Sequence, residues 1–355
     1  MIENKSFKKF APAILTIYKR DKELFWATIM SQFLSDQFFI KNSWQKIKLG
    51  VELVSVFNAL NKDAKNILNA YFKPLDIDIN KWKSNRNSYF EDAYPIFAFL
   101  VVWMYEVGLT GLLNKFDDIL KAGVFAVSGY GILDANVDGQ EPSPVEILAA
   151  QALISEYETL AIRTFGITEI NLEIMHKMRT LFLQAEIREK ICRGKCSPYT
   201  KDNPKECGAK GANAVTPFML ALEQLNKTDQ IDKYWEVFLL FGAAIQIIDD
   251  WTDLENDLTA GHYSYLTLGF GKTIKTSDLK TISKMLRTNE KLIEKTYNEG
   301  IHLINQSRKI LKELNDPTLE RLVDVTELRL KAYFSKELKM VLIPLTRDIS
   351  GVGQT

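Results

Sequence analysis

The sequence predicts an all-α protein, and three observations support this fold class. The chain of 355 residues is 46% hydrophobic but has only 18 Gly and 10 Pro, and most of the Pro lie outside the periodic stretches. Its apolar residues recur at helical spacings over long segments. No segment shows sustained alternation of apolar and polar residues, so no sheet is expected.

The expected helices start at the N-terminus with apolar stretches at 7–40 and 45–72. A polar stretch, DIDINKWKSNRNSYFED, then follows, but neither side of it looks able to bury its own apolar face. We therefore expect one domain over residues 1–355, in which N-terminal helices (1–90) pack on a bundle core (91–345). The next helices are expected at 93–138, as a pair divided near 108–111, and then at 144–164, 168–191 and 213–227. Another helix is expected to end near residue 261, and the last three are expected at 276–289, 290–314 and 317–343.

Composition and charge exclude several classes of protein. Lys plus Arg equal Asp plus Glu at 45 each, so no basic field favours nucleic acid, and none is expected as a partner. The start, MIENKSFKKF, lacks the apolar run of a signal peptide. The most lipid-like stretch, 94–113, contains Glu106, and its uninterrupted part is about a dozen residues, short of the roughly 20 that span a bilayer. We expect a cytoplasmic protein without a transmembrane segment.

The three cysteines, Cys192, Cys196 and Cys207, lie within one short segment. A structural zinc site needs four ligands, and no histidine is near them in the sequence. We interpret them as loop thiols in a reducing cytoplasm, although a disulfide between two of them, leaving one unpaired, stays open.

The stretch 245–267, IQIIDDWTDLENDLTAGHYSYLT, carries an unusual concentration of aspartates at the end of a predicted helix. At about 100° per residue, one glutamine and three aspartates share a narrow stripe, with Asp249 beside it. The stripe consists of Gln246, Asp250, Asp253 and Asp257. Like charges four residues apart oppose each other by about 0.2–0.5 kcal/mol per pair, and anions near a helix C-terminus oppose the macrodipole.

A solvated acidic surface is the plain alternative for this acidic cluster. The preceding residues 238–248, however, are almost wholly apolar, and so deeply buried a helix should not end in free carboxylates. A cation should therefore lie there. Oxygen-only ligands on one helical face suit a hard divalent ion, Mg²⁺ before Zn²⁺.

A second pair of carboxylates, Asp134 and Asp138, stands four residues apart at the end of another apolar helix, just before Gly139. Taken alone, such a pair is usually a surface feature. If both helices end at the same rim of a bundle, however, the two carboxylate groups face each other across one opening.

Two acidic clusters at the mouth of an apolar bundle favour a particular chemistry. Mg²⁺ held by aspartates commonly completes its shell with water and phosphate oxygens, so we expect a ligand with a diphosphate at the rim and an apolar part inside. The reaction favoured by such a site is metal-assisted departure of diphosphate. The resulting carbocation would be protected by a dry cavity and by aromatic faces, for which the chain offers 20 Phe, 13 Tyr and 6 Trp.

The acidic segment 245–267 resembles the second aspartate-rich helix of class I isoprenoid synthases, whose chain-elongating members read roughly Phe-Gln-x-x-Asp-Asp-x-x-Asp, then Asp and Gly-Lys. The residues on this pattern are Gln246, Asp249, Asp250, Asp253, Asp257 and Gly261. The first acidic segment, LDANVDG, is similar instead to squalene and phytoene synthases and to bacterial large-terpene synthases. The resemblance covers about residues 93–343.

The resemblance implies an all-α isoprenoid synthase-like bundle with extra N-terminal helices, three Mg²⁺ ions and an isoprenyl diphosphate substrate. It also implies that Asp134, Asp138, Asp249 and Asp253 are catalytic, and that the six aspartates of the two clusters bind metal. Gln246, Lys210, Asn213 and Tyr265 are expected to contact the substrate. A homodimer is left open, because helical bundles of this class often pair.

The Gly-Ala-Lys-Gly-Ala-Asn run at 208–213 supplies Lys210 and Asn213. Its small residues would let a helix N-terminus approach the diphosphate, while a flexible surface loop is the alternative. The family's usual lysine after the second motif is His262 here, and the paired Arg-Tyr of many terpene cyclases is absent from the late helix.

The sequence therefore predicts a class I terpene synthase, a carbon–oxygen lyase that ionises an isoprenyl diphosphate. No N-terminal basic motif for a second substrate is apparent, which argues against chain elongation as the function. The first alternative is a prenyltransferase that joins the prenyl cation to a second prenyl chain or a small acceptor. The second is a non-catalytic helical protein that keeps the fold and binds a lipid or a partner.

Overall fold

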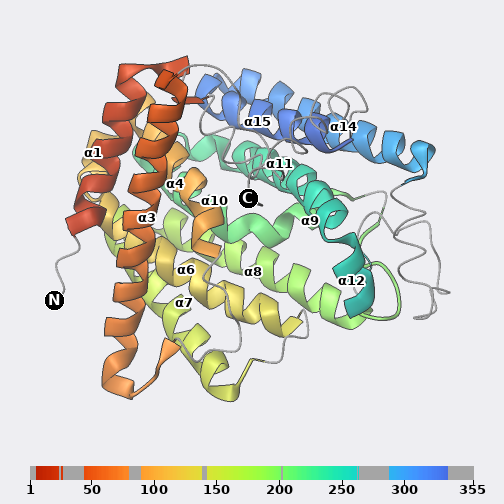
Figure 1. Cartoon of the computed structure of the whole chain (residues 1–355), viewed down its shortest axis with the longest axis horizontal. Helices are drawn as coiled ribbons and strands as arrows, with labels where there is room; N and C mark the ends of the chain where they lie inside the picture. Colours follow the sequence, from red (N-terminus) through yellow and green to blue (C-terminus); the bar gives the residue numbers. More distant parts are fainter. Residues whose placement is uncertain are drawn as a thin grey trace, which may run out of the picture. The chain divides into compact units, whose positions relative to one another are not determined.

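The computed structural model describes residues 5–23, 25–26, 44–79, 89–137, 142–200, 203–261, 263 and 288–334. Within these residues the regular structure is helical and there is no strand, which confirms the predicted all-α class (Figure 1). The principal helices are α1 (Lys5–Arg20), α3 (Trp44–Phe72), α4 (Tyr89–Glu106), α5 (Thr110–Leu113), α6 (Phe116–Val137), α7 (Pro144–Phe165), α8 (Glu169–Cys192), α9 (Lys205–Gly208), α10 (Ala212–Gln224), α11 (Ile231–Thr252), α12 (Leu254–Ala260), α14 (Glu290–Leu314) and α15 (Pro317–Phe334).

The helices form two compact units. The first comprises Met1–Ile29, Lys41–Glu186 and Ala212–Ile231, and the second comprises Met30–Ile40, Ile187–Gly211 and Asp232–Thr355. The first unit thus contains both the predicted N-terminal helices and much of the predicted core. The organisation of the chain as a single domain remains a prediction.

In the first unit, α1 packs against α3, α4 and α6. The amphipathic face of α1 buries Phe10, whose ring stacks on Phe116 of α6 with 6.1 Å between centroids. The charge in the lipid-like stretch is also paired here, because the Tyr18 hydroxyl donates to Glu106 Oε1 at 2.6 Å and Lys22 Nζ does so at 3.0 Å. No helix in the described part of the chain has the length and hydropathy needed to cross a membrane.

The helix breaks follow the local stop signals in the sequence. The predicted pair at 93–138 divides where Gly108 takes a φ of 82°, between the end of α4 and the start of α5. The predicted start after Ser143 is a capping box, in which the Ser143 hydroxyl accepts from the Glu146 N–H and the Glu146 carboxylate accepts from the Ser143 N–H.

The second unit contains α11, α12, α14 and α15. Figure 1 shows α14 and α15 side by side, and they pack so closely that a Cβ at Gly300 would come within 2.8 Å of Leu330 Cδ2 and require that side chain to shift. Asp316 begins α15 by accepting from the Leu319 N–H, and the Tyr234 hydroxyl of α11 donates to Asp316 at 3.1 Å. The predicted helix at 290–314 is confirmed. The one expected at 276–289 falls mostly outside the described residues.

The cysteines occupy three different environments, and all three are free thiols. Cys192 is the last residue of α8 and half-buried, Cys196 is exposed, and Cys207 lies buried in α9. The interpretation of all three as loop thiols is therefore wrong for Cys192 and Cys207. Burial raises the pKa of the Cys207 thiol far above its ordinary value, so it stays protonated and fills space like a small apolar group.

Candidate functional site

The acidic segment of the second unit consists of two consecutive helices, and the helical hydrogen bonding continues from the first into the second. Helix α11 ends at Thr252, and α12 begins after Asp253. Two backbone bonds keep the helical spacing across this break: the Asp253 N–H donates to the Asp249 carbonyl and the Asp257 N–H to the Asp253 carbonyl, each at 2.9 Å. Asp249, Asp253 and Asp257 therefore follow one another on successive turns.

Helix α12 stops where the sequence predicts a stop. Gly261 is its C-cap, with a φ of 77° that only glycine adopts without strain. Its carbonyl accepts a bond of 2.8 Å from the N–H of Gly194, in the turn that follows α8. The end of the acidic helix pair is thereby tied to the segment between α8 and α9.

The four aspartates of this segment differ in exposure. Asp249 and Asp253 are exposed and Asp257 is half-buried, whereas Asp250 is only 4% exposed. Gln246, one turn earlier, donates from Nε2 to Asp250 Oδ1 at 3.0 Å. The stripe predicted from the sequence is thus divided by burial: Gln246 binds the buried carboxyl of Asp250, while Asp253 is an exposed residue.

Burial dominates the electrostatics of Asp250. Loss of hydration raises the pKa of this carboxyl from 3.8 to about 7. The bond from Gln246 opposes that rise, the carboxylates of Asp249 and Glu189 reinforce it, and the ammonium of Lys210 lowers it. Asp250 therefore has two carboxylates and one lysine as charged neighbours within the same unit.

Lys210 lies between two helices, in the 3-10 turn Ala209–Gly211 that separates α9 from α10. Its Nζ donates to Glu189 Oε2 at 2.8 Å, and the two side chains are 20% and 7% exposed. The run at 208–213 is therefore not a flexible surface loop, since Gly208 and Ala209 are buried in helical turns. The structure brings three residues predicted from the sequence into one neighbourhood: Lys210, Gln246 and Asp250.

Two glycines set the backbone position of this turn against α11. A Cβ at Gly208 would overlap the Leu239 carbonyl oxygen and come within 2.8 Å of the Ala243 nitrogen. A Cβ at Gly242 would in turn come within 2.9 Å of the Gly208 carbonyl oxygen. Only residues without side chains allow the two backbones to approach so closely, and Lys210 follows two residues later.

Two further residues of this neighbourhood, Glu189 and Tyr199, were missed by the sequence reasoning. The Tyr199 hydroxyl donates a hydrogen bond to Glu189 Oε1. A signal for Glu189 was available, because it continues the buried face of α8 formed by Met178, Phe182 and Ala185 at helical spacing. No comparable pattern marks Tyr199, which lies in an irregular segment.

The other predicted site residues fall elsewhere. Asp134 is half-buried near the end of α6, and Asn213 is half-buried in the first turn of α10, both in the first unit. Asp138 and Tyr265 lie outside the described residues. The pairing of the two acidic clusters across one opening remains a prediction.

Metal binding by these residues also remains a prediction. In the described ranges, no three side chains of His, Cys, Asp or Glu come together as ligands of one ion would. The donor set nevertheless suits Mg²⁺: Asp249 and Asp253 are exposed aspartates one turn apart, and the ligands proposed for the ion are all oxygens.

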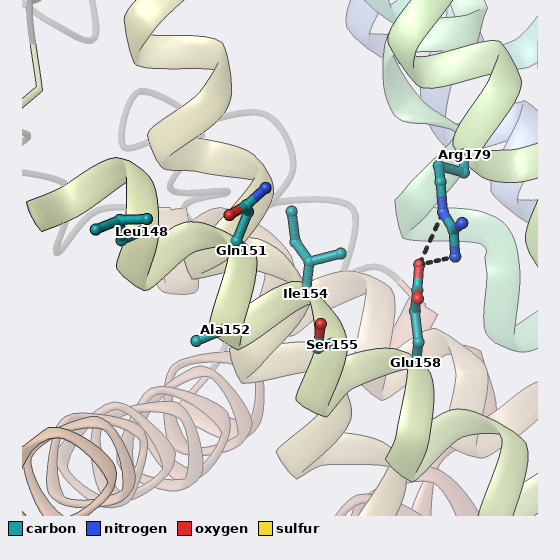
Figure 2. Close-up of a pocket in the computed structure, with 7 residues that line it drawn as sticks. All are labelled: Leu148, Gln151, Ala152, Ile154, Ser155, Glu158 and Arg179. Carbon is teal, nitrogen blue, oxygen red and sulfur yellow. Dashed lines mark hydrogen bonds and ion pairs between the residues drawn. The ribbon is translucent and has the colours of Figure 1, made fainter. Parts of the chain in front are cut away.

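A separate hollow of about 480 Å³ lies on the first unit, beside α7 and α8. Figure 2 shows its lining, in which Glu158 Oε1 accepts bonds from Arg179 Nε at 3.0 Å and from Nη2 at 2.5 Å. Its other lining residues are Leu148, Gln151, Ala152, Ile154 and Ser155. None of them belongs to the predicted site.

No family model matches the sequence, and no curated protein matches it significantly. A solved structure described as a geranylgeranyl pyrophosphate synthetase from the archaeon Geoglobus acetivorans superposes with a TM-score of 0.49 and 14% identity, over 78% of this chain and 99% of the other.

Proposed function

We propose that this protein is a class I terpene synthase, an enzyme that ionises an isoprenyl diphosphate with Mg²⁺ and forms a terpene product. The observation that carries the proposal is the pairing, within one unit, of an acidic helix end with a lysine. Asp249, Asp253 and Asp257 follow one another on successive turns, and Lys210 is held close enough to the buried Asp250 to lower its pKa. Carboxylates for a metal and an ammonium for phosphate oxygens are the two parts that a metal–diphosphate site requires.

In this proposal, Asp249, Asp250, Asp253 and Asp257 of the second acidic cluster would hold Mg²⁺, together with Asp134 and Asp138 of the first. The ions would neutralise the negative charge that develops on the diphosphate oxygens as the carbon–oxygen bond breaks. Lys210 donates N–H bonds to the same oxygens, and Gln246, Asn213 and Tyr265 complete the substrate contacts. The prenyl chain occupies an apolar interior that excludes water from the cation.

Asp250 differs from Asp249 and Asp253 in being buried. Its pKa of about 7 means that near neutral pH a proton can occupy this carboxyl when no cation is near. A cation at Asp249 would favour the ionised form, because an opposite charge within about 4–6 Å lowers a carboxyl pKa. In this proposal, Asp250 would give up that proton when Mg²⁺ binds.

The test is diphosphate release by the purified full-length protein with Mg²⁺ and, one at a time, geranyl, farnesyl, geranylgeranyl and longer prenyl diphosphates. Extracts are analysed for hydrocarbons and alcohols. Release from a single prenyl diphosphate with a cyclic product supports the terpene synthase. Release that requires a second prenyl diphosphate or a small acceptor would replace it with the prenyltransferase alternative.

A non-catalytic protein is distinguished by a thermal-shift titration. Mg²⁺ together with inorganic diphosphate should raise the melting temperature if the metal–diphosphate site is present, because a ligand that binds only the folded state stabilises it. No turnover with any substrate or acceptor, combined with no thermal shift, would favour a helical protein that binds a lipid or a partner.

A further inference from the structure

The Glu189 carboxylate is shared between two donors, one on each oxygen. Tyr199 donates to Oε1, and Lys210 Nζ donates to Oε2 at 2.8 Å. The Glu189 side chain is 7% exposed, so little water can reach its carboxylate. A buried carboxylate with a charged partner and a hydroxyl partner is held in one place, because losing either partner leaves an oxygen poorly satisfied.

The two donors to Glu189 lie in two different segments, both of which follow α8 in the sequence. Tyr199 is buried in the segment between α8 and α9, and Lys210 follows α9. Burial raises the pKa of Tyr199 well above its ordinary value, and the nearby Glu189 raises it further, so the hydroxyl keeps the proton that it donates. Glu189 is therefore fixed by Tyr199 independently of Lys210.

The backbone beneath Lys210 is fixed as well. The close approach of Gly208 and Gly242 sets the end of α9 against α11 without intervening side chains. What remains variable is the four-carbon side chain of Lys210, which carries about 2 kcal/mol of rotamer entropy when unconstrained. The ion pair with Glu189 removes much of this freedom before any ligand arrives.

We propose that Glu189 is a positioning residue: together with Tyr199, it holds the Lys210 ammonium beside the acidic helix so that Lys210 is ready to bind diphosphate. This inference rests on the proposed function of the site. An ammonium has three N–H donors, so a bond to Glu189 is compatible with further bonds to a ligand. Fixing a flexible side chain in its binding position raises affinity by lowering the entropy lost on binding.

The test uses a variant that moves the carboxylate without changing its charge. Glu189→Asp shortens the side chain by one methylene, so the carboxylate can no longer reach Tyr199 and Lys210 together. Inorganic diphosphate with Mg²⁺ is titrated into the full-length protein by calorimetry. We expect Glu189→Asp to raise the Kd about tenfold, since a charge-assisted contact is weakened.

A double-mutant cycle separates positioning from a structural role. In a Lys210→Met background there is no ammonium to position, so adding Glu189→Asp should change the Kd by less than about twofold. An equal loss of affinity in both backgrounds, or no loss in either, would overturn the role of Glu189. Glu206→Asp is the matched control, because Glu206 is a half-buried carboxylate of the same segment that pairs with Arg188 instead.

A second variant and a second readout keep the test decisive if Glu189→Asp folds poorly. Tyr199→Phe removes only the hydroxyl that fixes Glu189, and it should raise the Kd in the wild-type background but not beside Lys210→Met. In ligand-free protein, Glu189→Asp and Tyr199→Phe should speed labelling of Lys210 by an amine-reactive reagent, relative to Lys205 in the same digest. Unchanged labelling in both variants would contradict the proposal.

The experiments distinguish a failure of the proposed function from a failure of the role of Glu189. If the wild-type protein binds no diphosphate in the presence of Mg²⁺, the proposed function falls and the role of Glu189 falls with it. If the wild-type protein binds diphosphate but the variants show no coupling to Lys210, only the role of Glu189 is overturned.

Discussion

Lys210 Nζ lies 2.8 Å from Glu189 Oε2, and this ion pair joins the end of α8 to the turn that separates α9 from α10. Both groups act electrostatically on Asp250, the buried carboxyl of the acidic helix. Several carboxylates near a helix C-terminus oppose the helix dipole, and a lysine of the same unit thus partly balances their charge. That lysine was a candidate from the sequence, whereas its partner was not.

Lys210→Met should weaken diphosphate binding in the presence of Mg²⁺ by about ten- to a hundredfold, because a hydrogen bond to a charged group contributes about 1.5–3 kcal/mol. Calorimetric titration measures the change. Lys205→Met is the control, since Lys205 lies on α9 but pairs with Glu236. Equal losses in the two variants would mean that the general loss of positive charge, rather than a contact of Lys210, determines affinity.

Asp253→Asn should leave the fold intact and depress diphosphate release by orders of magnitude, because Asp253 is exposed and its carboxylate is assigned to the metal. Circular dichroism checks the fold and a diphosphate assay checks the turnover. Glu255→Gln removes the same charge from the same helix pair at another exposed position, about 200° around the helix. It should stay within a few-fold of wild type, and full activity in Asp253→Asn would contradict the metal assignment.

The raised pKa of Asp250 predicts a pH dependence of stability in metal-free protein. Its folded pKa of about 7 exceeds the ordinary 3.8, so the folded state binds this proton more tightly than the unfolded state does. The stabilisation is fully present below the unfolded value and is lost as the pH rises toward 7, by at most about 1.4 kcal/mol per pH unit.

Asp250→Asn provides the comparison for that pH dependence. Denaturant unfolding of both proteins from pH 4 to pH 8 should show the free energy of unfolding falling more steeply in wild type than in the variant. The asparagine keeps an oxygen that can accept the bond from Gln246. Parallel curves for the two proteins would show that Asp250 is not the group responsible.

Gly208→Ala should destabilise the protein by about 1–3 kcal/mol, because the new methyl group would force α9 away from the backbone of α11. The same displacement would move Lys210, so diphosphate affinity should fall as well. Gly211→Ala is the matched control three residues later, where a Cβ meets nothing within 4 Å, and it should be neutral or slightly stabilising. Thermal unfolding of the two variants decides between these outcomes.

The sequence was a good guide to the helices because their signals are local. The capping box at Ser143, the φ of 82° at Gly108 and the C-cap at Gly261 each depend on a few neighbouring residues. Periodic apolar residues likewise predicted α14, whose bounds match the expected range. Such features are decided by backbone stereochemistry and by burial of one helix face, which a sequence displays directly.

The site was predicted less completely because its contacts join distant segments. Helical periodicity places Gln246, Asp250, Asp253 and Asp257 on one stripe, as if the helix were isolated. Packing, however, buries Asp250 and leaves Asp253 exposed. The pair of Glu189 and Lys210 spans 21 positions and an irregular segment, so no spacing rule indicates it. A charged residue on an otherwise apolar helix face, as at Glu189, is the kind of signal that could have found it.

The most direct test of the central claim is a calorimetric titration of inorganic diphosphate into the wild-type protein with and without Mg²⁺. If the acidic helix pair and Lys210 form a metal–diphosphate site, binding will require Mg²⁺ and will be lost in Asp253→Asn. Diphosphate binding of equal affinity in the absence of Mg²⁺, or binding that is unchanged in Asp253→Asn, would contradict the account.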